Sequence, residues 1–312
     1  MNDVQDRPGV LAGVGDTPLV ALQRIVPRSG CRLLVKMESA NPTGSMKDRM
    51  AVEVITAAAA DGRLPEDGTV VEYTAGTTGI SLAFVCAALG YGLHVVFSDA
   101  FSTEKRRTLL ALGATVTDEP SQDGQITADL IKRMIARSER ISRNPSHWWS
   151  DQLTNRDAVR GYAPLGEEIW VQSEGQINAF IHTVGTAHSI QGVGEVLRRH
   201  HPTIRLVGVE PAESAVLGGG PTGAHRIEGI GIGFVPPLWE PTAVDDLDEV
   251  TSAEAQEMAR RLAVEEGLFA GTSTGANVVA ALREAERYDA TGTVVTLAVD
   301  SGLRYLSTAP YA

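Results

Sequence analysis

NPTGSMKDR, residues 41–49, is a turn sequence that leads directly into a helical pattern. Asparagine, proline, glycine and serine favour turns, and Met50 and Val54 begin an apolar pattern that recurs every three to four residues. This spacing predicts a helix over about residues 48–61 with one buried face and with Lys47 at its start. The helix dipole disfavours a cation at that end. Lys47 is therefore either a solvated surface lysine, which is the commoner case, or a lysine held for Schiff-base chemistry with a carbonyl compound.

Length and composition indicate a soluble globular protein. The 312 residues are enough for two domains or one large α/β domain, and 43% hydrophobic with 21% charged residues is ordinary for a folded chain. A formal net charge of −12 opposes binding to nucleic acid, which needs a basic face. The N-terminus lacks the pattern of a signal peptide, and Gly90 and Gly92 interrupt the most apolar run before it could span a membrane. We therefore expect a cytoplasmic protein with no membrane or nucleic-acid partner.

Strand and helix patterns alternate along the chain. Strands are expected at 31–37, 69–73, 93–97, 114–117, 179–183, 205–209 and 293–298. Helices are expected at 48–61, 80–89, 102–112, 126–138, 157–173, from 189 to about 199, and after a capping box at 251–254. Residues 139–156 are polar and are expected to connect two lobes. Strand–helix units repeated at this short spacing predict an α/β fold with a parallel sheet covered by helices on both faces.

Three turns of small residues stand where a strand pattern is expected to give way to a helix: 74–79 (TAGTTG), 185–189 (GTAHS) and 271–276 (GTSTGA). In an open parallel sheet such turns lie at the carboxyl ends of the strands, where ligands bind. The free N–H groups of a helix start there suit an anion. One such turn is usually an ordinary connection, but three together with Lys47 favour a phosphorylated or carboxylate ligand. No dinucleotide-binding or P-loop motif is present, and no cluster has metal-ligand spacing, so no metal is expected.

The chain resembles the cysteine synthase and cystathionine β-synthase family of fold-type II pyridoxal-phosphate (PLP) enzymes. The resemblance extends from DTPL at 16–19 to DSGLRYLST at 300–308, and the second motif and NPTGSMKDR are its most specific parts. It implies a fold similar to the tryptophan synthase β-subunit, with two open, twisted, mostly parallel sheets, flanking helices and an active site between the domains.

The resemblance also implies a domain division and an assembly. Residues 1–47 and 156–312 would form a larger PLP-binding domain, and residues 48–155 a smaller mobile domain that closes over the substrate. The partners implied are a small amino-acid substrate and a second copy in a homodimer. Partner enzymes are known in this family, although nothing in this sequence indicates one.

Each position that matches the family motifs has an implied role. Lys47 matches the lysine that forms the internal aldimine with PLP and later removes the Cα proton. The residues implied to bind the cofactor are Lys47, Thr77, the phosphate loop Gly185, Thr186, Ala187, His188 and Ser189, and Ser301, whose hydroxyl would meet the pyridine nitrogen. The residues implied to bind the substrate are Thr74, Ala75, Gly76, Thr77 and Gln152, which would surround its carboxylate, with Gly229 and Ile230 in a substrate-side turn.

Four positions depart from the family pattern. Thr77 and Ala75 stand where an asparagine and a serine are usual, and Ala187 and His188 replace two glycines of the phosphate loop, where His188 could add a charge. The departures leave the cofactor expectation intact but weaken the expectation of an ordinary O-acetylserine sulfhydrylase.

The implied activity is that of a transferase or lyase of amino-acid biosynthesis. A neutral serine at the ring nitrogen disfavours a long-lived quinonoid. The resemblance thus implies β-replacement on an activated L-serine through an aminoacrylate aldimine, most simply O-acetylserine plus sulfide giving L-cysteine. The alternatives left open are another donor or nucleophile (O-phosphoserine, thiosulfate, or an amine giving a diaminopropionate-type product) and net β-elimination by a cysteine or serine lyase. An alternative of another class is a catalytically silent homologue that binds a partner.

Overall fold

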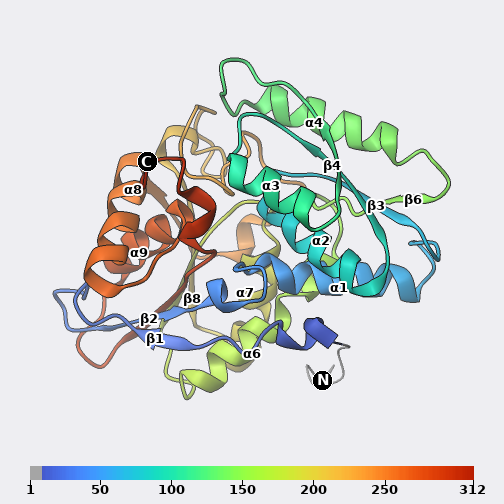
Figure 1. The fold of residues 1–312 in the computed structure, drawn as a ribbon. Helices are drawn as coiled ribbons and strands as arrows, with labels where there is room; N and C mark the ends of the chain where they lie inside the picture. The colour runs from blue at the N-terminus through green and yellow to red at the C-terminus, as the bar shows by residue number, and fades with distance from the viewer. Residues whose placement is uncertain (1–8) are drawn as a thin grey trace.

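The computed structural model describes residues 9–312, and residues 1–8 of the expected larger domain lie outside the described part. Its strands form two separate sheets, each surrounded by helices (Figure 1). The larger sheet has the order β1 (Leu19–Ala21), β2 (Arg32–Lys36), β10 (Thr293–Leu297), β7 (Ala179–Thr183), β8 (Arg205–Pro211) and β9 (Asp246–Val250). The smaller sheet has the order β5 (Thr115–Asp118), β4 (Gly92–Phe97), β3 (Thr69–Tyr73) and β6 (His147–Trp149). Neighbouring strands are parallel except β1, which is antiparallel to β2.

The α-helices connect the strands and cover the sheets. They are α1 (Lys47–Ala60), α2 (Thr77–Leu89), α3 (Thr103–Ala111), α4 (Ala128–Ile141), α5 (Asp157–Arg160), α6 (Ala163–Gln172), α7 (His188–His200), α8 (Ser252–Arg261) and α9 (Thr272–Ala285). Short 3₁₀ turns are η2 (Gly9–Gly13), η3 (Glu38–Ala40), η4 (Ala212–Ser214), η5 (Pro241–Ala243) and η7 (Gly302–Tyr305), and one π-helical turn, η6 (Leu262–Glu266), extends α8. Within residues 9–312, none of the helices combines the length and the apolar character that crossing a bilayer requires.

The larger sheet is buried on both faces. Successive side chains of a strand point to opposite faces, and Phe180 packs with the α6 and α7 side of the core, whereas Ile181 packs with the α8 and α9 side. The same alternation holds for Val295 and Val294 on β10. Consecutive residues of these strands are therefore apolar, because a parallel strand that is covered on both faces buries the side chains of both faces.

The smaller sheet has its own core, formed with α1, α2 and α4. In Figure 1, α4 lies across one side of this sheet, and α1 and α2 lie on the other. A loop that follows β8 in the larger unit also joins this core, because Ile232 and Phe234 pack against it. The two units are thus connected by apolar packing across the space between them.

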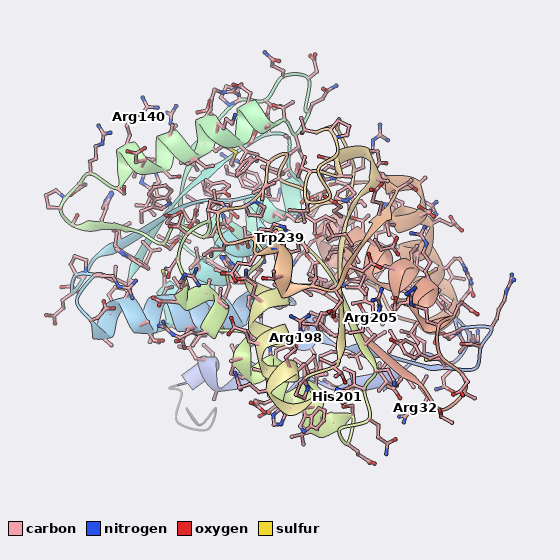
Figure 2. The ribbon with its side chains drawn as sticks, turned by 180° about the vertical axis from the view of Figure 1, so that it is seen from behind. Arg32, Arg140, Arg198, His201, Arg205 and Trp239 are labelled. Atoms are coloured by element: carbon pink, nitrogen blue, oxygen red, sulfur yellow. The ribbon has the colours of Figure 1, made fainter. Side chains whose placement is uncertain are left out.

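Basic side chains at the back of the larger unit are paired with acids. Figure 2 shows Arg198 and Arg205 on this side. Arg198 lies 3.1 Å from Asp245, and Arg205 lies 2.7 Å from Asp246 and 2.8 Å from Glu284. Partly exposed pairs of this kind contribute little stability individually, and they leave these two arginines without free charge for an anionic partner.

The α/β architecture and the expected strands are confirmed, and each of those strands lies within two residues of its expected ends. Strands β1, β6 and β9 were not expected. All three lie at sheet edges, where partial exposure weakens the apolar pattern. Residues 139–156, expected to connect two lobes, also contain strand β6, whose backbone pairs with β3.

One expected helix and one expected turn also need correction. The helix expected at 157–173 is divided into α5 and α6 around Gly161, where a Cβ atom would lie only 2.8 Å from the Cα atom of Met50. The turn expected at 271–276 is mostly the first turn of α9, and it follows a single bridge between Ala270 and Ser301 rather than a strand.

Candidate active site

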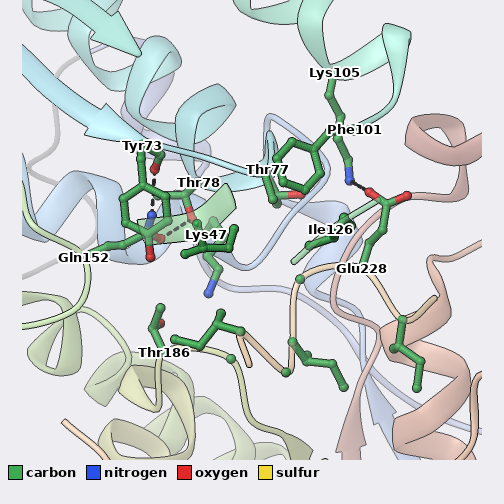
Figure 3. Close-up of a pocket in the computed structure, with 18 of the residues that line it drawn as sticks. Lys47, Tyr73, Thr77, Thr78, Phe101, Lys105, Ile126, Gln152, Thr186 and Glu228 are labelled. Atoms are coloured by element: carbon green, nitrogen blue, oxygen red, sulfur yellow. Dashed lines mark hydrogen bonds and ion pairs between the residues drawn. The ribbon is translucent and has the colours of Figure 1, made fainter. Parts of the chain in front are cut away.

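A pocket lies between the two sheets, at the carboxyl ends of their strands. Tyr73 ends β3, Gln152 follows β6 and Gly185 follows β7, and all three line the same pocket as Lys47 (Figure 3). An adjoining slot continues from Lys47 toward Asp300, which follows β10. This is the position at which open parallel sheets bind ligands. Among residues 9–312 no group of acids, histidines and cysteines is placed to hold a metal ion.

Lys47 is the first residue of α1 and points into this pocket (Figure 3). Among the described residues its ammonium has no hydrogen bond or ion pair, and its nearest aromatic contact is the Tyr162 ring, 6.0 Å away at the centroid. Burial lowers the pKa of Lys47 to about 8, an effect that the charge of Asp300 partly opposes. At neutral pH a fraction of the Lys47 amine is therefore unprotonated and available as a nucleophile.

The loop from Gly185 to Ser189 has the properties of an anion cradle. Ala187 adopts left-handed backbone angles (φ 70°) immediately before α7 begins. In the described chain no hydrogen bond uses the backbone N–H groups of residues 185–189. A Cβ atom at Gly185 would lie 2.6 Å from the carbonyl oxygen of Gly229, so only glycine fits this position. Free N–H groups at a helix start bind phosphate, and the cradle fits the phosphate of PLP.

A buried hydrogen-bond relay lies behind Ser189. Asn277 accepts from the Thr183 N–H (2.7 Å) and donates to the Leu297 carbonyl (2.9 Å), which fixes its amide so that Nδ2 faces Nδ1 of His182 (3.4 Å). His182 Nδ1 is then the acceptor, and its Nε2–H donates to the Ser189 hydroxyl oxygen, 2.8 Å away. Burial, with the charge of Lys47, lowers the pKa of His182 to about 3, so the ring is neutral. The hydroxyl hydrogen of Ser189 is left to donate to another acceptor.

His188 does not add a charge to the loop. Its side chain is 1% exposed, its Nδ1 lies 3.0 Å from the Thr186 hydroxyl, and burial lowers its pKa to about 3. The backbone carbonyl of Gln152 opposes this lowering of the pKa. Among the described residues, none forms a hydrogen bond with His188 Nε2. The histidine therefore fills space behind the loop as a neutral side chain.

The 74–79 turn offers N–H groups to a carboxylate. The Thr74 hydroxyl accepts from the N–H groups of Gly76 and Gly79, both at 2.9 Å, so its buried side chain shapes the turn. Among residues 9–312 no hydrogen bond uses the N–H groups of Ala75, Thr77 and Thr78 at the start of α2. Ala75 and Thr77 line the pocket. The turn can thus bind an anion through its backbone although Ala75 lacks a hydroxyl.

Gln152 is held against this turn. Its side-chain oxygen accepts from the Thr78 hydroxyl (3.0 Å), and its amide donates to the Tyr73 carbonyl (2.8 Å), as Figure 3 shows. Its backbone N–H donates to Glu72, a fully buried carboxyl whose pKa burial raises to about 7. One N–H of the Gln152 amide remains available, which suits the predicted contact with a substrate carboxylate.

The structure does not bring Ser301 to this pocket. Its hydroxyl accepts from the Leu303 N–H (3.3 Å) and caps η7, and the residue lines a different cavity, beside Thr43. Adjacent residues of an extended segment point to opposite sides, so it is Asp300 that faces the slot. Ser273, in the first turn of α9, also lines the slot. Sequence reasoning missed Ser273, although it lies inside the 271–276 turn that had been singled out.

Asp300 is a second charged group in the slot. Its carboxyl is fully buried and accepts from the Tyr305 hydroxyl (2.7 Å) and, at 3.4 Å, from the Thr77 hydroxyl. Burial raises the pKa of Asp300, while Arg304 and Lys105 oppose that rise. The slot therefore combines an unpaired lysine, a largely desolvated carboxyl and several hydroxyl-bearing side chains, among them Thr77, Ser189 and Ser273.

Comparisons with known proteins agree with this geometry. Residues 10–300 match the family described as "Pyridoxal-phosphate dependent enzyme". A cysteine synthase of Staphylococcus aureus strain N315 is 37% identical over 301 residues, which is 96% of this chain and 95% of that protein. The structure of O-ureido-L-serine synthase superposes with a TM-score of 0.91 at 34% identity, covering 97% of this chain and 94% of its own.

A third relative extends the comparison. The O-acetylserine-dependent cystathionine β-synthase of Helicobacter pylori superposes with a TM-score of 0.89 at 33% identity, covering 100% of this chain and 99% of its own. These matches confirm the resemblance to fold-type II enzymes and the PLP cofactor that was inferred from it. The chain belongs to the family of pyridoxal-phosphate dependent enzymes.

Proposed function

We propose that the protein catalyses β-replacement on an activated L-serine, most simply O-acetyl-L-serine with sulfide to give L-cysteine. The observation that carries this proposal is the state of Lys47, an unpaired amine with a pKa of about 8 that lies between an anion cradle and a carboxylate-binding turn. Relatives named cysteine synthase and O-acetylserine-dependent cystathionine β-synthase support this donor. O-ureido-L-serine synthase supports the same reaction class with a different nucleophile.

PLP, when bound, supplies an electron sink that lets a proton leave Cα and a leaving group leave Cβ of an amino acid. The 185–189 loop would hold its phosphate, with the Ser189 hydroxyl oriented for donation by His182. The residue that we propose for the pyridine nitrogen is Ser273 in place of Ser301, because Ser273 lines the slot. A neutral hydroxyl at that nitrogen limits the electron withdrawal of the ring and favours rapid loss of a β leaving group.

The remaining residues would position the substrate. The free N–H groups of Ala75, Thr77 and Thr78, with the amide of Gln152, would bind the substrate carboxylate and so fix the Cα–H bond relative to Lys47. The Lys47 amine would accept the Cα proton, since its lowered pKa leaves part of it unprotonated at neutral pH.

We further propose that residues 48–155 form a smaller domain that closes over the substrate and that the chain acts as a cytoplasmic homodimer. The position of the pocket between the two sheets supports the closing movement. The similarity to the enzyme family supports the dimer. Sedimentation of the PLP-loaded protein measures the oligomeric state directly.

The experiment that tests the proposed activity is a donor comparison with the PLP-loaded protein. L-cysteine formed from sulfide is measured by mass spectrometry with O-acetylserine, O-phosphoserine and L-serine as donors, and pyruvate is measured in the same samples. We expect L-cysteine from O-acetylserine and little pyruvate. Pyruvate as the main product would establish net β-elimination instead. Bound PLP with no reaction of any donor would contradict the proposal.

A further inference from the structure

The pocket has an outer part that the proposed chemistry does not use. Beyond Lys47, on the side away from Tyr73 and Gln152, Figure 3 shows Phe101 and Ile126 facing the cavity. Most of the side chains that line this outer part are apolar, namely Phe101, Ile126, Ile131, Ile227 and Ile232, and the polar ones are Lys105, Glu228 and His225. They come from both units, since Phe101 and Ile131 belong to the smaller unit and Ile232 to the loop after β8. A second substrate approaching Lys47 from solvent would pass between them.

The charges of this outer part neutralise each other. Lys105 Nζ lies 2.5 Å from Glu228 Oε2, and the two side chains are only 2% and 15% exposed. The same ammonium lies 4.4 Å from the centroid of the Tyr305 ring. The Lys105 stem packs on Gly76, where a Cβ atom would lie 2.4 Å from Lys105 Cδ, so the cation cannot easily turn elsewhere. Lys105 is therefore not a free cation for an incoming anion.

Both ring nitrogens of His225, the remaining basic side chain here, are already hydrogen-bonded to the backbone. Its Nε2 lies 2.7 Å from the Gly231 carbonyl, to which it donates, and its Nδ1 accepts from the Ile227 N–H at 3.3 Å. An anion entering the outer part would lose its hydration without gaining an unpaired cation, which is unfavourable. A hydrocarbon group would gain from the same burial.

The outer part is continuous with the surface. A neighbouring cavity of about 600 Å³ shares Ile126, His225 and Glu228 with the pocket, and its lining also includes the polar side chains Asp123, Arg226 and Gln256. A substrate longer than sulfide can therefore place its reacting atom near Lys47 while its far end extends toward this cavity.

We propose that the outer part is a subsite for the hydrocarbon body of the nucleophile, and that the preferred nucleophile is an uncharged alkyl or aryl thiol. This proposal rests on the proposed function. In the reaction the Cβ–O bond of O-acetylserine breaks with its electron pair on acetate, and a sulfur lone pair forms the Cβ–S bond. The thiol proton leaves to water, so the products are an S-substituted L-cysteine, acetate and a proton.

The test compares thiols that differ in length and in charge, with O-acetylserine as donor and the PLP-loaded enzyme. The probes are sulfide, ethanethiol, propanethiol, mercaptoacetate and homocysteine, and each rate is divided by the thiol's uncatalysed reactivity. We expect kcat/KM to rise roughly fourfold per added methylene and to be at least about tenfold lower for mercaptoacetate than for propanethiol. Equal or faster reaction of the charged thiols would overturn the subsite. Absence of product with every thiol, sulfide included, would overturn the proposed function itself.

Binding of products gives a readout that does not depend on turnover. S-propyl-L-cysteine and S-carboxymethyl-L-cysteine differ mainly in the charge of the group that would occupy the outer part. Calorimetry on the PLP-loaded protein should show at least about tenfold tighter binding of the propyl compound. The opposite order would contradict the proposal.

Two matched variants locate the effect. Ile126→Asn places an amide in the outer part, and Ile135→Asn makes the same change at another partly buried position, which packs on the same core outside the pocket. We expect Ile126→Asn to lower kcat/KM for propanethiol about tenfold and to leave sulfide unchanged, and Ile135→Asn to change neither. An equal loss for propanethiol and sulfide in Ile126→Asn would show that the residue does not form a nucleophile subsite.

Discussion

Basic residues at and near the start of α1 have two different surroundings. Lys36 and Arg49 are buried and paired: Lys36 lies 2.6 Å from Glu168, and Arg49 lies 2.7 Å from Glu38 and 2.6 Å from Glu168. Lys47 instead faces the pocket with no polar partner among the described residues. The chain thus places a cluster of ion-paired cations and one lysine without an ion pair close together at the start of α1.

The difference shows that pairing decides what a desolvated cation does. Arg49 and Lys36 lower the pKa of Glu168 to about 2, and the acids raise the pKa of Arg49, so these two charges are fixed and serve the fold. Burial lowers the pKa of Lys36, and its pair with Glu168 opposes this effect. Lys47 loses water without receiving an acid in direct contact, and its pKa falls to about 8. The paired cluster anchors the helix, and the unpaired lysine at its start is free to react.

Removing the unpaired lysine should have the largest effect on activity. We expect Lys47→Ala to lower product formation by at least about 10³-fold, because it removes both the nucleophile for PLP and the Cα base. Its unfolding free energy should change by less than about 1 kcal/mol, because no polar contact is lost. Activity is measured by mass spectrometry and stability by urea unfolding. Turnover near that of the unmodified protein would remove Lys47 from the mechanism.

Removing a paired cation should have the reverse effect. Arg49→Met leaves Glu38 and Glu168 buried with too little positive charge, which should lower the unfolding free energy by about 3–5 kcal/mol. The control is Arg143→Met, at a position whose pair with Glu139 is exposed and should be worth less than about 0.5 kcal/mol. Equal stability of the two variants in urea unfolding would show that the buried cluster is not structural.

His182 is also buried beside the pocket, and it is hydrogen-bonded to Ser189 and Asn277. We expect His182→Phe to weaken PLP binding to the apo protein about 10- to 100-fold, because the Ser189 hydroxyl loses its orientation toward the phosphate. Binding of pyridoxal, which has no phosphate, should change by less than about twofold. Ser189→Ala should have the same effect, and the double variant should lose no more than either single one. Additive losses would show that His182 acts separately from Ser189.

The rate at which the apo protein binds PLP should depend on pH in a way that distinguishes Lys47 from an ordinary lysine. Because the pKa of Lys47 is lowered, its ammonium loses its proton as the pH rises through about 8. An ordinary lysine would require a pH above 10. The rate at which apo protein binds PLP should therefore rise about tenfold between pH 7 and pH 9 and then level off. Stopped-flow absorbance measures this rate. A rate that continues to rise to pH 10.5 would show that Lys47 is not desolvated.

Much of the fold could be predicted from local patterns. The apolar strands β3, β7 and β10 are buried on both faces, so their composition is distinctive, whereas the edge strand β9 reads DLDEV and resembles a loop. The NPTGSMKDR motif predicted the position of Lys47 at a helix start, which the structure confirms.

The parts of the site that could not be predicted depend on distant contacts. Asn277 lies 95 residues from His182, and Glu228 lies 123 residues from Lys105, so no local pattern links them. Ser301 is a different case: it is next to Asp300, which lines the slot, but the extended backbone turns the Ser301 side chain toward another cavity.

The loop that carries Ile232 and Phe234 into the core of the smaller unit has a thermodynamic consequence. A closing movement of that unit, as proposed above, would remove apolar surface of these side chains from water. Burial of apolar surface lowers the heat capacity. The affinity for a substrate that closes the pocket should therefore follow a curved van't Hoff plot, so the enzyme would respond to temperature through its binding step as well as through its chemistry.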